Sequence, residues 1–261
     1  MLALVTGGSK GIGEAICKQL ANDGYTVIVN YNSSKINAQK VAKDINGYSY
    51  KADVSNLQEV KTMVDYIIQN FGSIDLLVNN AGISVVGLFH QVSKEDAKRI
   101  LDINLNGVLN CTSEVVKHMI SKKSGNIINI SSMWGEIGGS CEVHYSATKS
   151  AIIGFTKALA KEVGLSGIRV NCVSPGVIDT SMNSHLSQED LNSLKEEIPL
   201  YRLGTPQDVA NVVSFLASSK ASYITAQDIA VNGGICWYLT RGENFWKYTG
   251  QIKIAWYVLE F

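Results

Sequence analysis

The stretch TGGSKGIG, residues 6–13, follows the apolar run LALV at residues 2–5 and opens a helical pattern over residues 13–23. Gly7, Gly11 and Gly13 permit a tight turn in which the backbone closely approaches a pyrophosphate, whose charge suits a helix N-terminus. The spacing differs from the G-x-G-x-x-G pattern of many dinucleotide folds, and no Walker A loop is completed, which disfavours ATP. The stretch therefore predicts a phosphate-binding turn between a strand and a helix; the alternative is a glycine-rich turn without a ligand.

Outward from this turn, strand and helix patterns alternate along the chain. Strands are predicted at residues 2–5, 26–30, 48–54, 76–80, 126–131, 168–175 and 227–233. Helices are predicted near residues 13–23, 34–45, 56–71, 94–121, 146–164 and 206–218, the last opened by Thr205 and Pro206. Several strands are apolar on successive residues, as in parallel strands covered on both faces. The pattern predicts an α/β fold, a single Rossmann-type doubly wound parallel sheet of about seven strands with helices on both faces.

Composition excludes several classes of function. Of 261 residues, 46% are apolar and 18% are charged, which is typical of a globular protein. Lys and Arg number 23 against 23 Asp and Glu, so no nucleic-acid surface is expected. Five scattered cysteines without a C-x-x-C pair indicate reduced thiols in a cytoplasmic protein, and no metal site is expected. No basic leader opens the chain, and no apolar run reaches the roughly 18 residues that span a bilayer, so neither a signal peptide nor a membrane segment is expected.

Two segments depart from the alternation. Residues 182–204 carry a small predicted helix at 188–197, opened by Ser187 and Asp190, and such an insertion at the carboxyl ends of the strands is a natural substrate lid. One domain is therefore expected over residues 1–236. Residues 237–261 form an extension without a clean period whose aromatic residues are Trp237, Tyr238, Phe245, Trp246, Tyr248, Trp256, Tyr257 and Phe261. The extension could cover a subunit interface, cap the substrate pocket of a neighbouring subunit or have no selected role.

The end of the second predicted strand bears on the choice of dinucleotide. An NAD site generally places Asp or Glu there to hold the ribose 2′-hydroxyl. This strand instead ends Asn30-Tyr31-Asn32-Ser33, with no carboxylate to repel a 2′-phosphate. Lys10, with Ser33, Ser34 or Lys35, could pair with that phosphate. NADP(H) is therefore predicted over NAD(H), unless Lys10 is only a solvated loop charge.

Tyr145 and Lys149 lie four residues apart and so share one face of a predicted helix. An ammonium one turn from a phenol lowers the pKa of the phenol, which would make Tyr145 a useful proton donor. Ser132 stands upstream, at the end of a predicted strand. Tyr31 and Lys35 repeat the spacing, but they follow the second strand, away from any substrate, and are interpreted as a chance copy.

Six motifs occur in order with familiar intervals, namely TGGSKGIG, NNAG at residues 79–82, Asn104 within DINLNG, Ser132, Tyr145-x-x-x-Lys149 and Pro175-Gly176. Over residues 1–236 the chain resembles the short-chain dehydrogenase/reductase family. The resemblance implies that Tyr145 protonates a ketone oxygen while Ser132 polarises the carbonyl. It also implies that Lys149 lowers the pKa of the tyrosine and holds the nicotinamide ribose, and that Asn104 holds a water for proton resupply.

The same resemblance implies the contacts to the cofactor. Asn80, Ala81 and Gly82 would pass the adenosine ribose, and Asp53 with Val54 would bracket the adenine. Residues 175–180 would line the nicotinamide, with two of them meeting its carboxamide. The full expected set is Gly7, Ser9, Lys10, Gly11, Ile12, Gly13, Asn30, Ser33, Asp53, Val54, Asn80, Ala81, Gly82, Tyr145, Lys149, Pro175, Gly176, Ile178 and Thr180.

Within the family the chain is most similar to bacterial 3-oxoacyl-ACP reductases. Reductases that dock acyl carrier protein usually carry two basic residues beside the active-site mouth; Lys123 keeps one, and Ser166 replaces the other. The stretch WGEIGGSCEVHYS, residues 134–146, is instead similar to the branch that reduces a 5-aminopentanone group on elongation factor P, and there Glu142 could meet the amine. Otherwise Glu142 and its neighbours only pack the loop.

Several alternatives stay open from the sequence. A steroid or sugar-alcohol dehydrogenase is possible because the lid sets substrate choice. A binding protein that has lost its chemistry is disfavoured, since Ser132, Tyr145 and Lys149 are all present. The resemblance further implies a homotetramer or homodimer built on the helices near 94–121 and 146–164.

Overall fold

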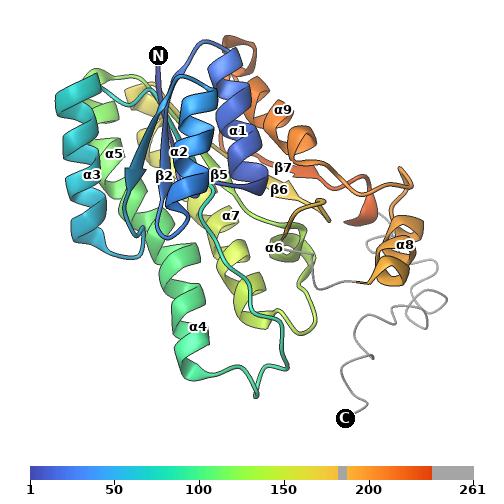
Figure 1. Cartoon of the computed structure of the whole chain (residues 1–261). Coiled ribbons are helices and arrows are strands. Elements are labelled where there is room, and N and C mark those ends of the chain that lie inside the picture. The colour runs from blue at the N-terminus through green and yellow to red at the C-terminus, as the bar shows by residue number, and fades with distance from the viewer. Residues whose placement is uncertain (182–186, 237–261) are drawn as a thin grey trace.

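The computed structural model describes residues 1–181 and 187–236. Its centre is a seven-stranded sheet in the order β3-β2-β1-β4-β5-β6-β7, with every neighbouring pair parallel (Figure 1). The strands are β1 (Leu2–Val5), β2 (Thr26–Tyr31), β3 (Tyr48–Lys51), β4 (Leu76–Asn79), β5 (Gly125–Ile130), β6 (Ile168–Pro175) and β7 (Asp228–Val231). The chain runs outward from β1 to β3 and then returns to β4, so the strand order reverses between β1 and β4. A ligand crevice is expected at the carboxyl ends of the strands at such a point.

Helices cover both faces of the sheet, as predicted (Figure 1). The helices are α1 (Gly11–Asn22), α2 (Lys35–Asp44), α3 (Leu57–Phe71), α4 (Lys94–Leu101), α5 (Gly107–Lys122), α6 (Met133–Ile137), α7 (Val143–Val163), α8 (Gln188–Glu197) and α9 (Pro206–Ala217). One apolar core lies between the sheet and α1, α2 and α9. A second core lies between the opposite face and α3, α5 and α7. Both faces of the sheet are covered by helices and shielded from water, which explains why the strand sequences are apolar on successive residues.

The local signals of the sequence account for the helix ends. Ser187 forms the predicted capping box with Asp190, and Thr205, predicted as an N-cap, forms a further capping box with Asp208. Asn56 accepts hydrogen bonds from the first-turn N–H groups of α3 through its side chain. These caps satisfy donors that no helical carbonyl can reach, and each stabilises its helix by about 1 kcal/mol.

The structure differs from the predicted elements in two places near the crevice. The single helix predicted at 94–121 is interrupted by a π-helical turn, Asp102–Asn106, between α4 and α5. The short helix α6 was not predicted, because five residues with two flanking glycines carry no helical period. The predicted lid 182–204 contains α8, while residues 182–186 and the extension 237–261 lie outside the described residues.

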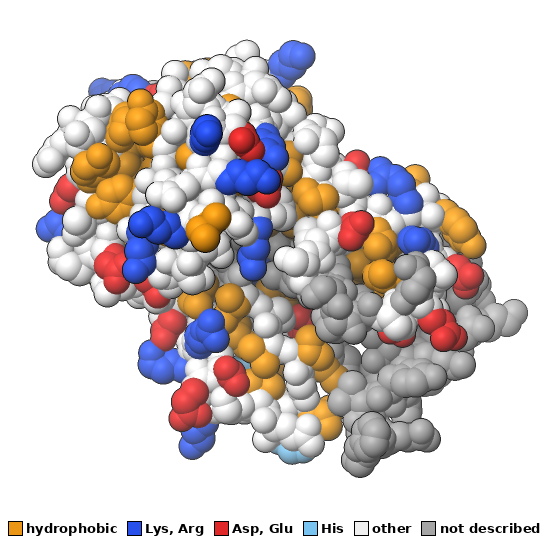
Figure 2. Space-filling model, in the orientation of Figure 1, with side chains coloured by type: hydrophobic (Ala, Val, Ile, Leu, Met, Phe, Trp, Pro, Cys, Tyr) orange, Lys and Arg blue, Asp and Glu red, His pale blue; other side chains and the backbone are white. Residues whose placement is uncertain are grey.

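The surface mixes both signs of charge, with apolar side chains gathered on the flank beside α2 and α3 (Figure 2). In the described part of the chain no helix combines the length and the apolar character that crossing a bilayer requires.

Candidate active site

The glycine loop lies between β1 and α1 and packs against the segment that follows β4. Gly7 has a φ of 62°, and a Cβ on it would lie 2.9 Å from the Cα of Ala81. A Cβ on Gly13 would lie 2.3 Å from the carbonyl oxygen of Gly7. Thr6 joins the two segments, because its Oγ1 accepts from the N–H groups of Asn80 and Ala81 at 2.9 and 3.0 Å. Glycine is thus required here by the packing of the loop itself.

Two residues expected to contact the cofactor hold the glycine loop from within. Asn30, 2% exposed, accepts from the Gly7 N–H through Oδ1 at 3.3 Å and donates to the Ala52 carbonyl at 3.0 Å. Asn80 donates through Nδ2 to the carbonyl oxygens of Thr6 and Gly7 at 3.0 and 3.1 Å. The side-chain amides of both residues are therefore engaged by the protein, which indicates a supporting role for these side chains beside any cofactor contact of their backbones.

Several of the groups expected near the adenosine end are exposed at the surface. Lys10, Asn32 and Ser33 are exposed, and in the described part of the chain no carboxylate lies within ion-pair distance of Lys10. The Asp53 carboxylate accepts from Asn32 at 2.9 Å and from the hydroxyl of Ser55 at 2.7 Å. A cationic side chain without an acidic partner, at the edge of a phosphate-binding loop, fits an anion such as a 2′-phosphate. Ser9, which precedes Lys10, and Val54, which follows Asp53, are both buried.

Loop 175–180 forms the facing wall of the crevice. A Cβ on Gly176 would lie 2.7 Å from the Cα of Asn232, so this loop packs closely on the chain after β7. Ile178, 5% exposed, forms an isolated parallel bridge with Gly204 at the end of the predicted lid. The Cγ2 of Thr180 lies 3.5 Å from the position of a Cβ on Gly11. The glycine loop and loop 175–180 therefore meet across the carboxyl ends of the strands.

Ser132, Tyr145 and Lys149 converge beside this crevice. Ser132 follows β5 and is the N-cap of α6, where its Oγ accepts from the Trp134 N–H at 3.2 Å. Its side chain also hydrogen-bonds Tyr145. Tyr145 and Lys149 both lie on α7, and the Lys149 Nζ is 5.4 Å from the centroid of the Tyr145 ring. The structure therefore brings together the three residues on which the sequence prediction centred.

Burial shifts the two titrating groups in opposite directions. Removal from water raises the pKa of Tyr145 to about 12; the charge of Glu142 adds to the rise and the hydrogen bond with Ser132 opposes it. Burial also lowers the pKa of Lys149 to about 8. The loss of solvent around the phenol outweighs the other effects here, and the role of Lys149 in lowering the pKa of Tyr145 stays a prediction.

The surroundings of Lys149 fit a group with hydroxyls. The side chain is 4% exposed, and its Nζ donates to the Ile130 carbonyl at 2.8 Å. An ammonium carries three N–H donors, and within the described residues this is the one hydrogen bond recorded for them. A Cβ on Gly82 would lie 3.6 Å from this Nζ, so glycine leaves the approach open. The donors that remain suit the two hydroxyls of a ribose, as a dinucleotide would present.

Asn104 lies within the π-helical turn and is fully buried. Its Oδ1 accepts from the Ile83 N–H at 2.8 Å, and its Nδ2 donates to the Ile83 carbonyl at 2.8 Å. The Nδ2 also reaches the Thr148 hydroxyl at 3.4 Å. The turn thus aims a helical asparagine at the segment beyond β4, a placement for which the sequence offered only the DINLNG motif.

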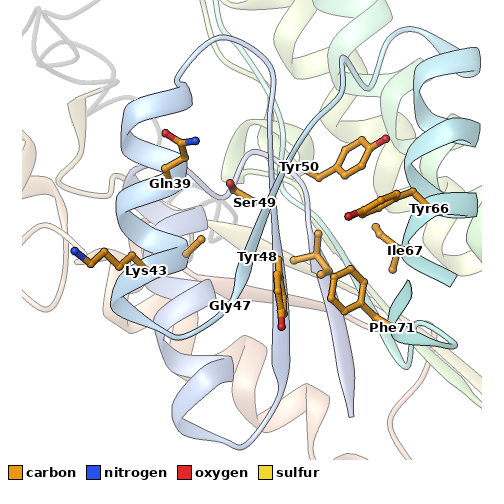
Figure 3. A pocket seen from close by; sticks show the side chains of 11 residues that line it. Gln39, Lys43, Gly47, Tyr48, Ser49, Tyr50, Tyr66, Ile67 and Phe71 are labelled. Atoms are coloured by element: carbon orange, nitrogen blue, oxygen red, sulfur yellow. The ribbon is translucent and has the colours of Figure 1, made fainter. Parts of the chain in front are cut away.

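The size of a surface hollow does not identify the candidate active site. A hollow of about 700 Å³ lies at the outer edge of the sheet around β3 (Figure 3). Aromatic side chains from β3 and α3 line it, with the rings of Tyr48 and Phe71 4.5 Å apart. None of the expected catalytic or cofactor residues lines this hollow. The convergence of Ser132, Tyr145 and Lys149 is the stronger evidence, because it combines titratable groups with a phosphate-binding turn.

Comparison with known proteins agrees with this arrangement. The family model described as enoyl-(acyl carrier protein) reductase matches residues 7–236. The 3-oxoacyl-[acyl-carrier-protein] reductase FabG of Staphylococcus aureus is 44% identical over 238 residues, which cover 89% of this chain and 97% of that protein. The FabG proteins of Staphylococcus epidermidis and Thermotoga maritima are 44% and 39% identical, over 89% and 90% of this chain and 98% and 97% of their own lengths.

Proposed function

The chain belongs to the short-chain dehydrogenase/reductase family and is an NADP(H)-dependent oxidoreductase, and on this premise we propose that it reduces the ketone of a 3-oxoacyl group carried on acyl carrier protein. That substrate is the one in the names of its relatives. The observation that carries the proposal is the convergence of Ser132, Tyr145 and Lys149 beside a phosphate-binding turn.

The proposed chemistry follows from what each side chain can donate. NADPH, when bound, supplies the hydride that reaches the carbonyl carbon. The Tyr145 hydroxyl donates its proton to the ketone oxygen, and Ser132 hydrogen-bonds the same oxygen where negative charge develops. Because the pKa of Tyr145 is raised to about 12, the phenol is protonated at neutral pH and ready to donate. Lys149 holds the nicotinamide ribose with its remaining donors, and Asn104 supports the route by which the proton is replaced.

The proposed cofactor site uses the loops around the switch in strand order. The glycine loop, including Ser9 and Ile12, binds the pyrophosphate at the start of α1, and Lys10 with Ser33 binds the 2′-phosphate. Asp53 and Val54 bracket the adenine. Residues 80–82 pass the adenosine ribose, and residues 175–180 line the nicotinamide. The proposed domain spans 1–236, with the substrate lid at 182–204.

Within one protomer, Lys123 does not lie beside the candidate active site, where a basic residue for docking the carrier protein was expected. Lys123 ends α5 at the amino end of β5, whereas Ser132 follows the carboxyl end of that strand. The carbonyl oxygen of Lys123 lies against Gly167, so Lys123 and Ser166 share one corner of the molecule. A carrier protein that contacted this corner and delivered its ketone to Tyr145 would need a second subunit to bring the two surfaces together. This supports the proposed homotetramer or homodimer.

A second candidate is the reduction of a 5-aminopentanone group on elongation factor P. Glu142 favours it, since its half-buried carboxylate lies close enough to Tyr145 to raise the pKa of the phenol. In the described part of the chain no Lys, Arg or His nitrogen pairs with Glu142. A carboxylate beside the proton donor opposes the formation of tyrosinate, and a cationic substrate would remove that penalty.

The proposal is tested by NADPH consumption with an acetoacetyl thioester, an amino-ketone and a steroid ketone, with NADH as the paired control. Turnover of the thioester with NADPH is expected. Activity on the amino-ketone alone would favour the elongation factor P substrate, and activity on the steroid alone would favour the dehydrogenase alternative. Absence of turnover on all three would contradict a ketone reductase of this kind.

A further inference from the structure

Several hydrogen bonds connect the start of α7, where Tyr145 lies, to neighbouring segments of the chain. Asn104 grips both backbone groups of Ile83 and reaches the Thr148 hydroxyl. That hydroxyl donates in turn to the Tyr145 carbonyl at 2.7 Å. One side of the first turn of α7 is therefore tied to the π-helical turn and to the segment that follows β4.

Two side chains, Ser84 and Glu142, connect the start of α7 to the segment that follows β4. Ser84, the residue after Ile83, donates its hydroxyl to the Oε1 of Glu142. Glu142 is the N-cap of α7, yet its side chain accepts no hydrogen bond from the first-turn N–H groups of that helix. Glutamate is not one of the residues that commonly cap a helix at this position, so its side chain is available for another partner. Here the carboxylate accepts from Ser84 and so joins two segments that are far apart in the chain.

Two further contacts join the same segments. The Gly87 N–H donates to the Cys141 carbonyl at 2.8 Å. Cys141 adopts a φ of 61°, which L side chains rarely adopt, so the chain before α7 is strained where it makes this contact. The ring of Phe89 stacks on that of His144, with centroids 5.1 Å apart and planes 17° apart. Residues 83–92 therefore meet the start of α7 at three points, through Ser84, Gly87 and Phe89.

We propose that Ser84 and Glu142 are positioning residues, whose hydrogen bond clasps residues 83–92 onto the start of α7 and so sets the place of the Tyr145 hydroxyl in the crevice. The inference rests on the proposed function, in which Tyr145 is the proton donor. It assigns Glu142 a role that any ketone substrate would need. The second carboxylate oxygen of Glu142 is left over for a cationic substrate, so the clasp is compatible with either carrier.

The test compares Ser84→Ala, Glu142→Ala, the double variant and Glu142→Gln in the full chain. With an acetoacetyl thioester, Ser84→Ala and Glu142→Ala are each expected to lower kcat about tenfold, because small displacements of a proton donor are costly. The double variant should be no slower than either single variant, since both remove one contact. Glu142→Gln should stay within about twofold of the wild type, because its amide oxygen still accepts from Ser84. Dissociation constants for NADPH should change little.

Ser124→Ala and Glu162→Gln, at exposed positions, are the matched controls. Amide hydrogen exchange supplies a readout independent of turnover: Ser84→Ala should speed exchange at the Gly87 N–H, and Ser84→Thr should restore protection. Unchanged kcat and exchange in Ser84→Ala would overturn the clasp, and so would a loss in Glu142→Gln as large as in Glu142→Ala. If the wild type turned over no ketone, the proposed function would fail, while the exchange data would still decide whether the clasp exists.

Discussion

Burial shifts the pKa values of Tyr145 and Lys149 in opposite directions, yet both residues stay protonated near neutral pH. A phenol with a pKa of about 12 keeps its proton until the ketone accepts it. An ammonium with a pKa of about 8 is still charged at pH 7, although it is close to losing its proton. Both residues therefore hold a proton at pH 7.

Tyr145→Phe is expected to lower kcat by at least about a hundredfold, because general acid catalysis by a positioned group contributes that much or more. The change removes one hydroxyl and leaves the ring beside Lys149, so the affinity for NADPH should be retained. NADPH oxidation and a fluorescence titration measure the two quantities. Tyr31→Phe, in the second Tyr-x-x-x-Lys sequence, is the matched control and should keep full turnover at saturating NADPH. Loss of turnover in Tyr31→Phe but not in Tyr145→Phe would assign the chemistry to Tyr31 and Lys35 instead.

The lowered pKa of Lys149 predicts a stability that rises with pH. The folded pKa of about 8 lies below the ordinary value of 10.5, so between these values the unfolded chain binds more protons than the folded chain. The contribution of this group to the free energy of unfolding should therefore increase by about 2 kcal/mol from pH 7 to pH 9.5. Urea denaturation of the wild type and of Lys149→Met measures it. Parallel pH profiles for the two proteins would refute the buried charge.

Lys10 tests the choice of dinucleotide. Lys10→Ala should weaken NADPH binding about tenfold or more, because a charged hydrogen bond to phosphate is lost. Binding of NADH, which has no 2′-phosphate, should be unchanged. Lys61→Ala, an exposed lysine on α3, is the control. Equal losses for both dinucleotides would place Lys10 at the pyrophosphate instead.

At the scale of elements, the π-helical turn matters most, because it aims the buried Asn104 amide at the backbone of Ile83. Asn104→Ala leaves the N–H and carbonyl of Ile83 without these partners. The free energy of unfolding should fall by about 2 kcal/mol, roughly 1 for each hydrogen bond. The kcat should fall as well, because Ile83 precedes the segment that lies against the start of α7. Asn106→Ala, an exposed asparagine of the same turn, should change neither quantity.

The outcome of this comparison can be read by chemical denaturation together with NADPH oxidation. A fall in stability without a fall in kcat would separate the turn from catalysis. No change in stability would mean that the turn closes onto Ile83 without the side chain.

At the scale of the whole molecule, the described residues contain apolar side chains suited to a subunit contact. Leu101, Leu109 and Ile120 are each about two-fifths exposed and lie on α4 and α5. These side chains belong to α4 and α5 and not to the extension. A chain ending at Cys236 should therefore keep the same subunit number as the full chain, measured by light scattering.

The cut is placed after Cys236 because Ile235 and Cys236 are buried and pack with Met133 and Ile198. Ending the chain at Gly234 would remove part of that cluster beside α6 and confuse folding with assembly. Dissociation of the shorter chain into monomers would show that the extension holds the subunits together.

The sequence by itself determined the parallel sheet, the glycine-rich turn between β1 and α1, and the catalytic candidates. These depend on local signals: apolar runs of strand length, glycines at a strand-to-helix turn, and a Tyr and Lys one turn apart. The bounds of β6, Ile168–Pro175, and of α8, Gln188–Glu197, were predicted without error, because a long apolar run and a capping box mark them.

Only the tertiary structure decided how these residues are held. The amides of Asn30 and Asn80 support the glycine loop, Asn104 sits on a π-helical turn, and Glu142 crosses to Ser84. Each of these facts joins segments far apart in the chain, which no local pattern encodes. The pKa of Tyr145 likewise depends on more than its spacing from Lys149. Desolvation depends on every atom packed around the phenol, whereas the sequence shows only the neighbour four residues away.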